Sequence, residues 1–137
     1  MNIKLIFQLS LFGLAMAIAT VFWIPLNYEP FFWLIIFFIC AYQIAKKCFE
    51  KYFLNGFLVS LVNCIWITAA HLILFHNYII HHPRVAKMMM KMPMHRSPRL
   101  LMLVAGPIIG ILSGILLGLF SFMASRMIRK KLEMIDK

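Results

Sequence analysis

The chain has very few acidic side chains. Charged residues make up 13% of its 137 residues, and only 4 residues are Asp or Glu. All of these acids stand outside the long apolar runs: Glu29, Glu50, Glu133 and Asp136. No predicted membrane span therefore holds a carboxylate that could carry protons or coordinate sodium.

The sequence also lacks the motifs of common catalytic sites. It contains no phosphate-binding loop, no HExxH motif and no nucleophile–base–acid set. Its 3 cysteines form no CxxC pair, and Cys40 and Cys64 stand inside apolar runs, where a small buried thiol is typical. We therefore expect a protein that is not an enzyme and needs no cofactor.

Apolar residues, in contrast, are abundant. They make up 64% of the chain, against roughly 45–50% in soluble proteins, and the mean hydropathy is +0.90. So few charged side chains cannot cover so much apolar surface in water. The composition predicts one domain, residues 1–137, in a lipid bilayer.

Four apolar runs approach the roughly 20 residues that a helix needs to cross a bilayer. Prolines separate the first two runs and stand in the connection between the last two. The predicted fold is an all-α integral membrane bundle of four transmembrane helices, with spans at about residues 5–24, 31–45, 52–80 and 100–123.

The N-terminus has a second interpretation. A basic start, an apolar middle and small residues at Ala15, Ala17 and Ala19 also fit a cleaved secretory signal. Hydrophobicity continues to Ile24, however, which gives a full span. We therefore expect the first run to be retained as a transmembrane helix.

The distribution of basic residues predicts the orientation. Short loops rich in Lys and Arg stay in the cytoplasm. With both termini inside, nine bases are cytoplasmic: Lys4, Lys46, Lys47, Lys51, Arg126, Arg129, Lys130, Lys131 and Lys137. The reverse orientation leaves only five inside. The sequence thus predicts a multi-pass protein of the bacterial inner membrane with cytoplasmic termini.

That orientation places the basic segment of residues 81–99 on the outer face. Arg84, Lys87 and Lys91 fall within an arc of about 60° on a helix, beside a methionine-rich flank. Such a segment is typical of a short amphipathic helix in a membrane interface, between the third and fourth spans. The candidate contacts to headgroup phosphates or another anion are Arg84, Lys87, Lys91, Arg96 and Arg99. Alternatively the third span is re-entrant and the segment is cytoplasmic.

The same segment could bind Cu(I), because thioethers and imidazoles are soft ligands. The weak candidate ligands are Met88, Met92, Met94 and His95. Lys87 and Lys91 stand among these methionines and would repel a cation. Packing in the interface is therefore the favoured interpretation, and no metal site is predicted.

Glycines recur at every fourth position of the fourth span: Gly106, Gly110, Gly114 and Gly118. On a helix they form one face without side chains, called here the glycine stripe, against which another backbone can pack closely. The partner is a helix of the same chain or of a second copy. A pore or ligand lining is the alternative.

The third span carries a sparse polar face. Its candidate members are Ser60, Asn63, Cys64, Thr68, His71 and Tyr78. On one helix, Ser60, Cys64, His71 and Tyr78 project within about 40° of one another. An ionisable residue inside a membrane is a functional candidate, although a neutral His71 bonded to a neighbouring helix is the simpler interpretation.

The segment "YFLNGFLVSLV", the "HHP" that follows the third run, the methionine-rich connector ending in "RSPR" and the final "GPIIGILSGILLGLF" together resemble a family of small bacterial four-span membrane proteins of unknown function, common in Bacteroidota. The resemblance covers roughly residues 50–131. It implies a fold and a location, and no mechanism.

Three functions fit the sequence. The first is a non-enzymatic membrane protein that acts through helix–helix contacts, as a homo-oligomer or an accessory subunit. The second is a small transporter or channel for an anionic solute, and the third is a Cu(I)-binding protein. The expected partners are the bilayer, anionic headgroups and another membrane subunit or copy. Nucleic acid is not expected, because the bases are distributed as topology signals.

Overall fold

The computed structural model describes residues 2–25, 27–91 and 97–135, and every element in these ranges is a helix. The helices are α1 (Ile3–Phe22), α2 (Glu29–Lys47), α3 (Tyr52–Ile73), α4 (Phe75–His81), α5 (Pro83–Lys91) and α6 (Pro98–Ile135). Four of them, α1, α2, α3 and α6, are long and apolar enough to cross a membrane. This confirms the predicted all-helical fold with four candidate spans.

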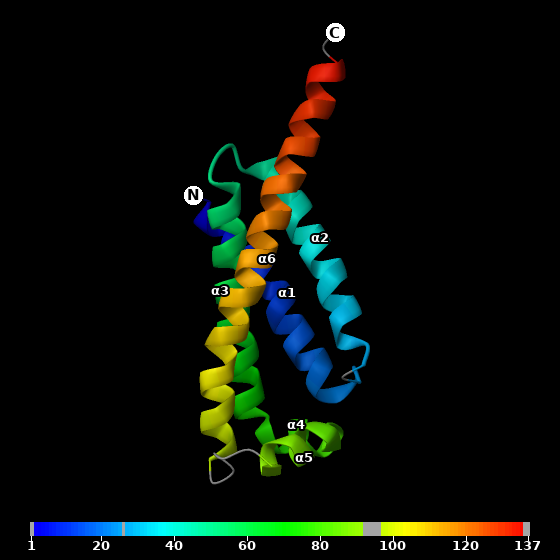
Figure 1. Ribbon diagram of the computed structural model, residues 1–137, viewed down its shortest axis with the longest axis vertical. Helices are drawn as coiled ribbons and strands as arrows, with labels where there is room; N and C mark the ends of the chain where they lie inside the picture. The colour runs from blue at the N-terminus through cyan, green and yellow to red at the C-terminus, as the bar shows by residue number, and fades with distance from the viewer. Residues whose placement is uncertain (1, 26, 92–96, 136–137) are drawn as a thin grey trace.

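The two longest helices form the centre of the molecule. In Figure 1, α3 and α6 run side by side in opposite directions, and their shared interface is the most extensive in the fold. α1 packs against α3, while α2 packs mainly against α6. Both chain termini lie at one end, called here the terminal end (Figure 1). α4 and α5 lie at the opposite end, called here the capped end.

The third apolar run differs from its prediction. It is not one straight helix over residues 52–80, because α3 ends at Ile73 and α4 begins at Phe75. α4 turns aside there to lie against the end of α1 (Figure 1). Hydropathy indicates which residues avoid water, but it does not indicate the direction of a helix. The turn between α3 and α4 could therefore not be predicted from it. The last helix continues past residue 123 to Ile135.

Asn55 closes the terminal end. Its side chain is 1% exposed. Its amide donates to the carbonyls of Glu50 at 3.3 Å and Lys51 at 3.0 Å, and its oxygen accepts from the backbone N–H of Asn2 at 3.3 Å. Asn2 in turn caps α1 by accepting from the N–H of Leu5 at 3.2 Å. One buried amide thus fixes the starts of α1 and α3 relative to each other.

The terminal half of the bundle has a filled apolar core. Side chains from all four long helices and from the α2–α3 loop meet there, so helix packing is complete at this end. The core residues are Leu5, Ile6, Leu9, Phe37, Cys40, Ala41, Ile44, Cys48, Val59 and Leu117.

The glycine stripe of α6 faces α3. An added Cβ at Gly110 would lie 2.7 Å from the Cβ of Cys64, and one at Gly114 would lie 2.9 Å from the Cδ2 of Phe57. The closest backbone approach is at Gly56 of α3, where an added Cβ would lie 2.8 Å from the carbonyl oxygen of Leu117. The stripe is therefore used within the chain, as a small-residue helix interface.

Large apolar side chains cover the outside of the long helices. They include Phe7, Leu11, Phe31, Ile35, Phe38, Ile65, Ile108, Leu112 and Met123, all of which are exposed. A soluble protein rarely exposes so large an apolar surface. This surface fits a multi-pass membrane protein whose outer face contacts lipid.

We predict that Gly110→Leu destabilises the folded subunit by about 1–3 kcal/mol, the usual cost of overpacking. Its side chain would have to displace Cys64 and separate α3 from α6. Ile111→Phe is the matched control, because Ile111 is exposed on the same helix. Denaturation of the detergent-solubilised protein measures both. Equal stability of the two variants would show that α3 and α6 do not pack through the stripe.

Candidate functional site

A cavity of about 480 Å³ lies between α2, α3 and α6, with side chains of α4 and α5 at its capped end. The filled core stops at Phe37, which contributes to both the core and the cavity wall. The residues that line the cavity are Glu29, Trp33, Phe37, Ser60, Asn63, Cys64, Ile67, Thr68, His71, Tyr78, Met89, Met102, Ala105, Gly106, Ile109, Gly110 and Ser113.

All six members of the predicted polar face line this one cavity. They are Ser60, Asn63, Cys64, Thr68, His71 and Tyr78. The first five lie on α3, and Tyr78 joins them from α4. The face that the sequence indicated thus forms one wall of a partly open cavity between the helices.

Where α3 meets α6, the cavity wall carries hydroxyl and thiol groups. The hydroxyls of Ser60 and Ser113 are 2.8 Å apart, and the Cys64 thiol donates to the carbonyl oxygen of Gly106 at 2.8 Å. Ser113 also donates to the carbonyl of Ile109 at 2.7 Å. These hydroxyl and thiol groups thus have hydrogen-bond partners. Because glycine has no side chain, the backbone carbonyls of α6 lie close enough to α3 to accept these bonds.

Asn63 is the exception in this wall. It is 2% exposed, yet neither its Nδ2 nor its Oδ1 has a hydrogen-bond partner among the described residues. Gly13 of α1 lies directly against its side chain and makes room for it. The Nε2 of His71 is likewise buried without a partner in this part of the chain. A buried polar group left unpaired costs about 1–3 kcal/mol, so these atoms lower the stability of the fold.

The opposite wall comes from one face of α2. Glu29, Trp33 and Phe37 follow one another at intervals of four residues, so they share a helical face. The indole Nε1 of Trp33 donates to Oε1 of Glu29 at 3.3 Å, and the rings of Trp33 and Phe37 lie edge to face at 6.1 Å. Glu29 stands outside the predicted second span, so this wall was not predicted. The four-residue spacing of Glu29, Trp33 and Phe37 could have indicated it.

Three neighbouring rings lead from the cavity to the connection between α4 and α5. The centroids of His71 and Tyr78 are 4.3 Å apart, and those of Tyr78 and His82 are 4.7 Å apart. α4 lies outside the four candidate spans. Burial, and after it the carboxylate of Glu29, raises the pKa of Tyr78 to about 12. Its phenol therefore stays neutral and can donate a hydrogen bond.

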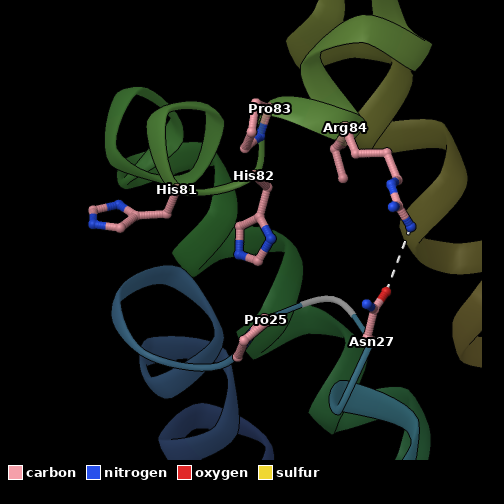
Figure 2. Close-up of a pocket in the computed structure, with 7 residues that line it drawn as sticks. Pro25, Asn27, His81, His82, Pro83 and Arg84 are labelled. Carbon is pink, nitrogen blue, oxygen red and sulfur yellow. Dashed lines mark hydrogen bonds between the residues drawn. The ribbon is translucent and has the colours of Figure 1, made fainter.

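His82, which connects α4 and α5, forms a hydrogen bond with the end of α1. Its Nε2 lies 2.8 Å from the carbonyl oxygen of Thr20, and since a carbonyl only accepts, this nitrogen carries the proton. Figure 2 shows His82 between α4 and the end of α1, with Arg84 reaching toward Asn27. Arg84 donates to the amide oxygen of Asn27 at 3.5 Å. The hollow of about 150 Å³ in Figure 2 thus lies between the α4–α5 connection and the α1–α2 loop.

The bases expected to contact an anion do not line the cavity. Arg84, Lys87 and Lys91 are exposed on or beside α5, and the guanidinium of Arg99 lies 5.4 Å from the centre of the Phe75 ring. Arg96 lies outside the described residues. α5 lies within the predicted basic segment, and its Met89 is buried.

The candidate copper ligands are not brought together in the part of the chain that is described. Met88 is exposed on α5, and Met92, Met94 and His95 lie outside the described residues. Within the described residues, no group of three His, Cys, Asp or Glu side chains could hold a metal ion.

Comparison of the chain with protein-family models, curated proteins and solved structures finds no match. The functional argument therefore depends on the residues of the cavity.

We predict that Asn63→Leu stabilises the protein by about 1–3 kcal/mol, because leucine has the same branching at Cγ and leaves no donor or acceptor unpaired. Denaturation in detergent, compared with the unchanged protein, measures this effect. Ser60→Ala is the control and should not stabilise, since Ser60 already bonds Ser113. A clear loss of stability in Asn63→Leu would mean that the carboxamide is paired in the folded protein.

Proposed function

We propose that this protein is a membrane-embedded binding protein for a small, mainly apolar molecule that carries hydrogen-bonding groups. The observation that carries the proposal is the cavity of about 480 Å³, whose mainly apolar wall includes the side chains of Ser60, Cys64, Thr68 and Ser113. Cavities of roughly 300–1,000 Å³ with apolar walls and a few convergent polar groups are typical ligand sites. The bound molecule would exchange hydrogen bonds with the hydroxyl groups of this wall.

The chemistry of the wall supports binding without catalysis. The serine and cysteine side chains are bonded to each other or to carbonyls. A reversible role fits these residues, in which the protein holds, carries or senses its ligand. The expectation from the sequence that the chain is not an enzyme stays a prediction.

The proposed binding function differs from the assembly function that the sequence favoured. The glycine stripe was the main reason to expect assembly with a second copy or another subunit. Its close contacts are now made by α3 of the same chain. Assembly remains a prediction, and the outer apolar surfaces are its support. The Cu(I) hypothesis has no further support from the residues described.

For the membrane, we propose the bacterial inner membrane with the terminal end in the cytoplasm. The count of nine cytoplasmic bases against five supports this orientation. α5 would then lie in the outer interface, where its exposed Arg84, Lys87 and Lys91 can contact headgroup phosphates. The resemblance to the Bacteroidota family agrees with this location and stays a prediction.

To test binding, we predict that 1-naphthalenemethanol, a neutral apolar probe with one hydroxyl, binds the protein in lipid nanodiscs. Ala105→Phe should weaken this binding at least about tenfold, equivalent to about 1.4 kcal/mol, because its ring would fill the cavity. Val104→Phe is the matched control, since Val104 is 50% exposed on the same helix. Equilibrium dialysis against empty nanodiscs measures both. Equal binding by the two variants would place the probe elsewhere and contradict the proposal.

To test the orientation, reporter fusions after Ile24, at Lys47, at Met90 and at the C-terminus should alternate between the outer face and the cytoplasm, beginning outside. The physical reason is the retention of basic loops inside. Cytoplasmic signals at both Lys47 and Met90 would rule out the proposed topology.

A further inference from the structure

We propose that the ligand of this cavity is an organic cation, namely a protonated amine attached to an apolar, preferably aromatic, body. The inference rests on the proposed function and adds the chemical class of the ligand. It comes from the charge and the aromatic content of the cavity wall, and it differs from the anionic solute that the basic loop suggested.

The charge of the wall has one sign. Among the described residues that line the cavity, Glu29 is the only acid, and there is no Lys or Arg. An isolated charge is costly beside apolar walls. An anionic ligand would add a second negative charge beside the carboxylate, whereas an ammonium group would pair with it. The wall therefore selects against anions and for cations.

The aromatic side chains strengthen this selection. Trp33 and Phe37 continue the face of α2 that begins with Glu29 and line the same space. Faces of such rings attract ammonium groups, with Trp the strongest. The indole N–H of Trp33 also bonds Glu29 at 3.3 Å, which orients the carboxylate for a ligand.

The position of Ser60 indicates the extent of the ligand. Along α3, Ser60 is eleven residues from His71, which corresponds to about 16 Å of helix. Glu29 and Tyr78 belong to the capped end, while Ser60 lies deeper. An amine held near Glu29 could thus extend an apolar body toward the hydroxyls of Ser60 and Ser113. Arylalkyl amines have this shape.

A matched set of three probes tests the inference: 1-naphthylmethylamine, 1-naphthalenemethanol and 1-naphthoic acid. They share one ring system and differ mainly in charge at neutral pH. Binding to the full chain is measured by equilibrium dialysis in nanodiscs of zwitterionic lipid, with empty nanodiscs subtracted. We expect the amine to bind about tenfold more tightly than the alcohol, equivalent to about 1.4 kcal/mol, and the acid to bind most weakly.

Two variants assign this preference to the carboxylate. Glu29→Gln should remove the advantage of the amine over the alcohol, and denaturation in detergent reports whether the variant is folded. Glu50→Gln is the control, because Glu50 is exposed in the α2–α3 loop at the terminal end and should leave all three probes unaffected.

The outcomes separate this inference from the proposed function. Equal binding of amine and alcohol, or tighter binding of the acid, would overturn the cation and leave the cavity as a binding site. An amine preference that survives in Glu29→Gln would overturn the role of this carboxylate and with it the inference. If none of the three probes binds, both the inference and the proposed function fail.

Discussion

Close contact between the backbones of α3 and α6 determines the rest of the fold. Gly56 brings α3 to the carbonyl of Leu117, and the glycine stripe continues this approach toward the capped end. Because dispersion contacts and not the hydrophobic effect drive helix association in lipid, such intimate contact is the main source of cohesion available. α1 and α2 then pack on opposite members of this central pair, on α3 and α6 respectively.

The size of the side chains between the helices explains where the cavity lies. In the terminal half, leucine, isoleucine and phenylalanine side chains fill the space between the helices. In the capped half, serine, threonine and glycine stand where a packed core would need larger side chains. α4 and α5 close this space with Tyr78 and Met89 instead of filling it. The unpaired Asn63 lowers stability, a cost that proteins typically accept at functional sites.

Much of this arrangement could be predicted from the sequence, because it depends on local pattern. Length and hydropathy indicate the four spans, the spacing of four shows the glycine stripe, and helical geometry groups Ser60 with Cys64 and His71. The turn at Leu74 could not be predicted, since it depends on where the end of α1 lies. Gly56 belongs to no repeat, so its close contact with α6 could not be predicted. The place of Glu29 in the cavity wall depends on how α2 packs opposite α3. These features depend on contacts between distant segments.

The central claim is that the cavity is kept open for a ligand. The most direct measurement is an experimental structure of the protein extracted with its native lipids by a polymer, without detergent. The account predicts density for a bound molecule between α2, α3 and α6, in contact with the side chains of Ser60 and Ser113. A collapsed cavity, with α2 packed against α3 and no space left between the helices, would contradict it.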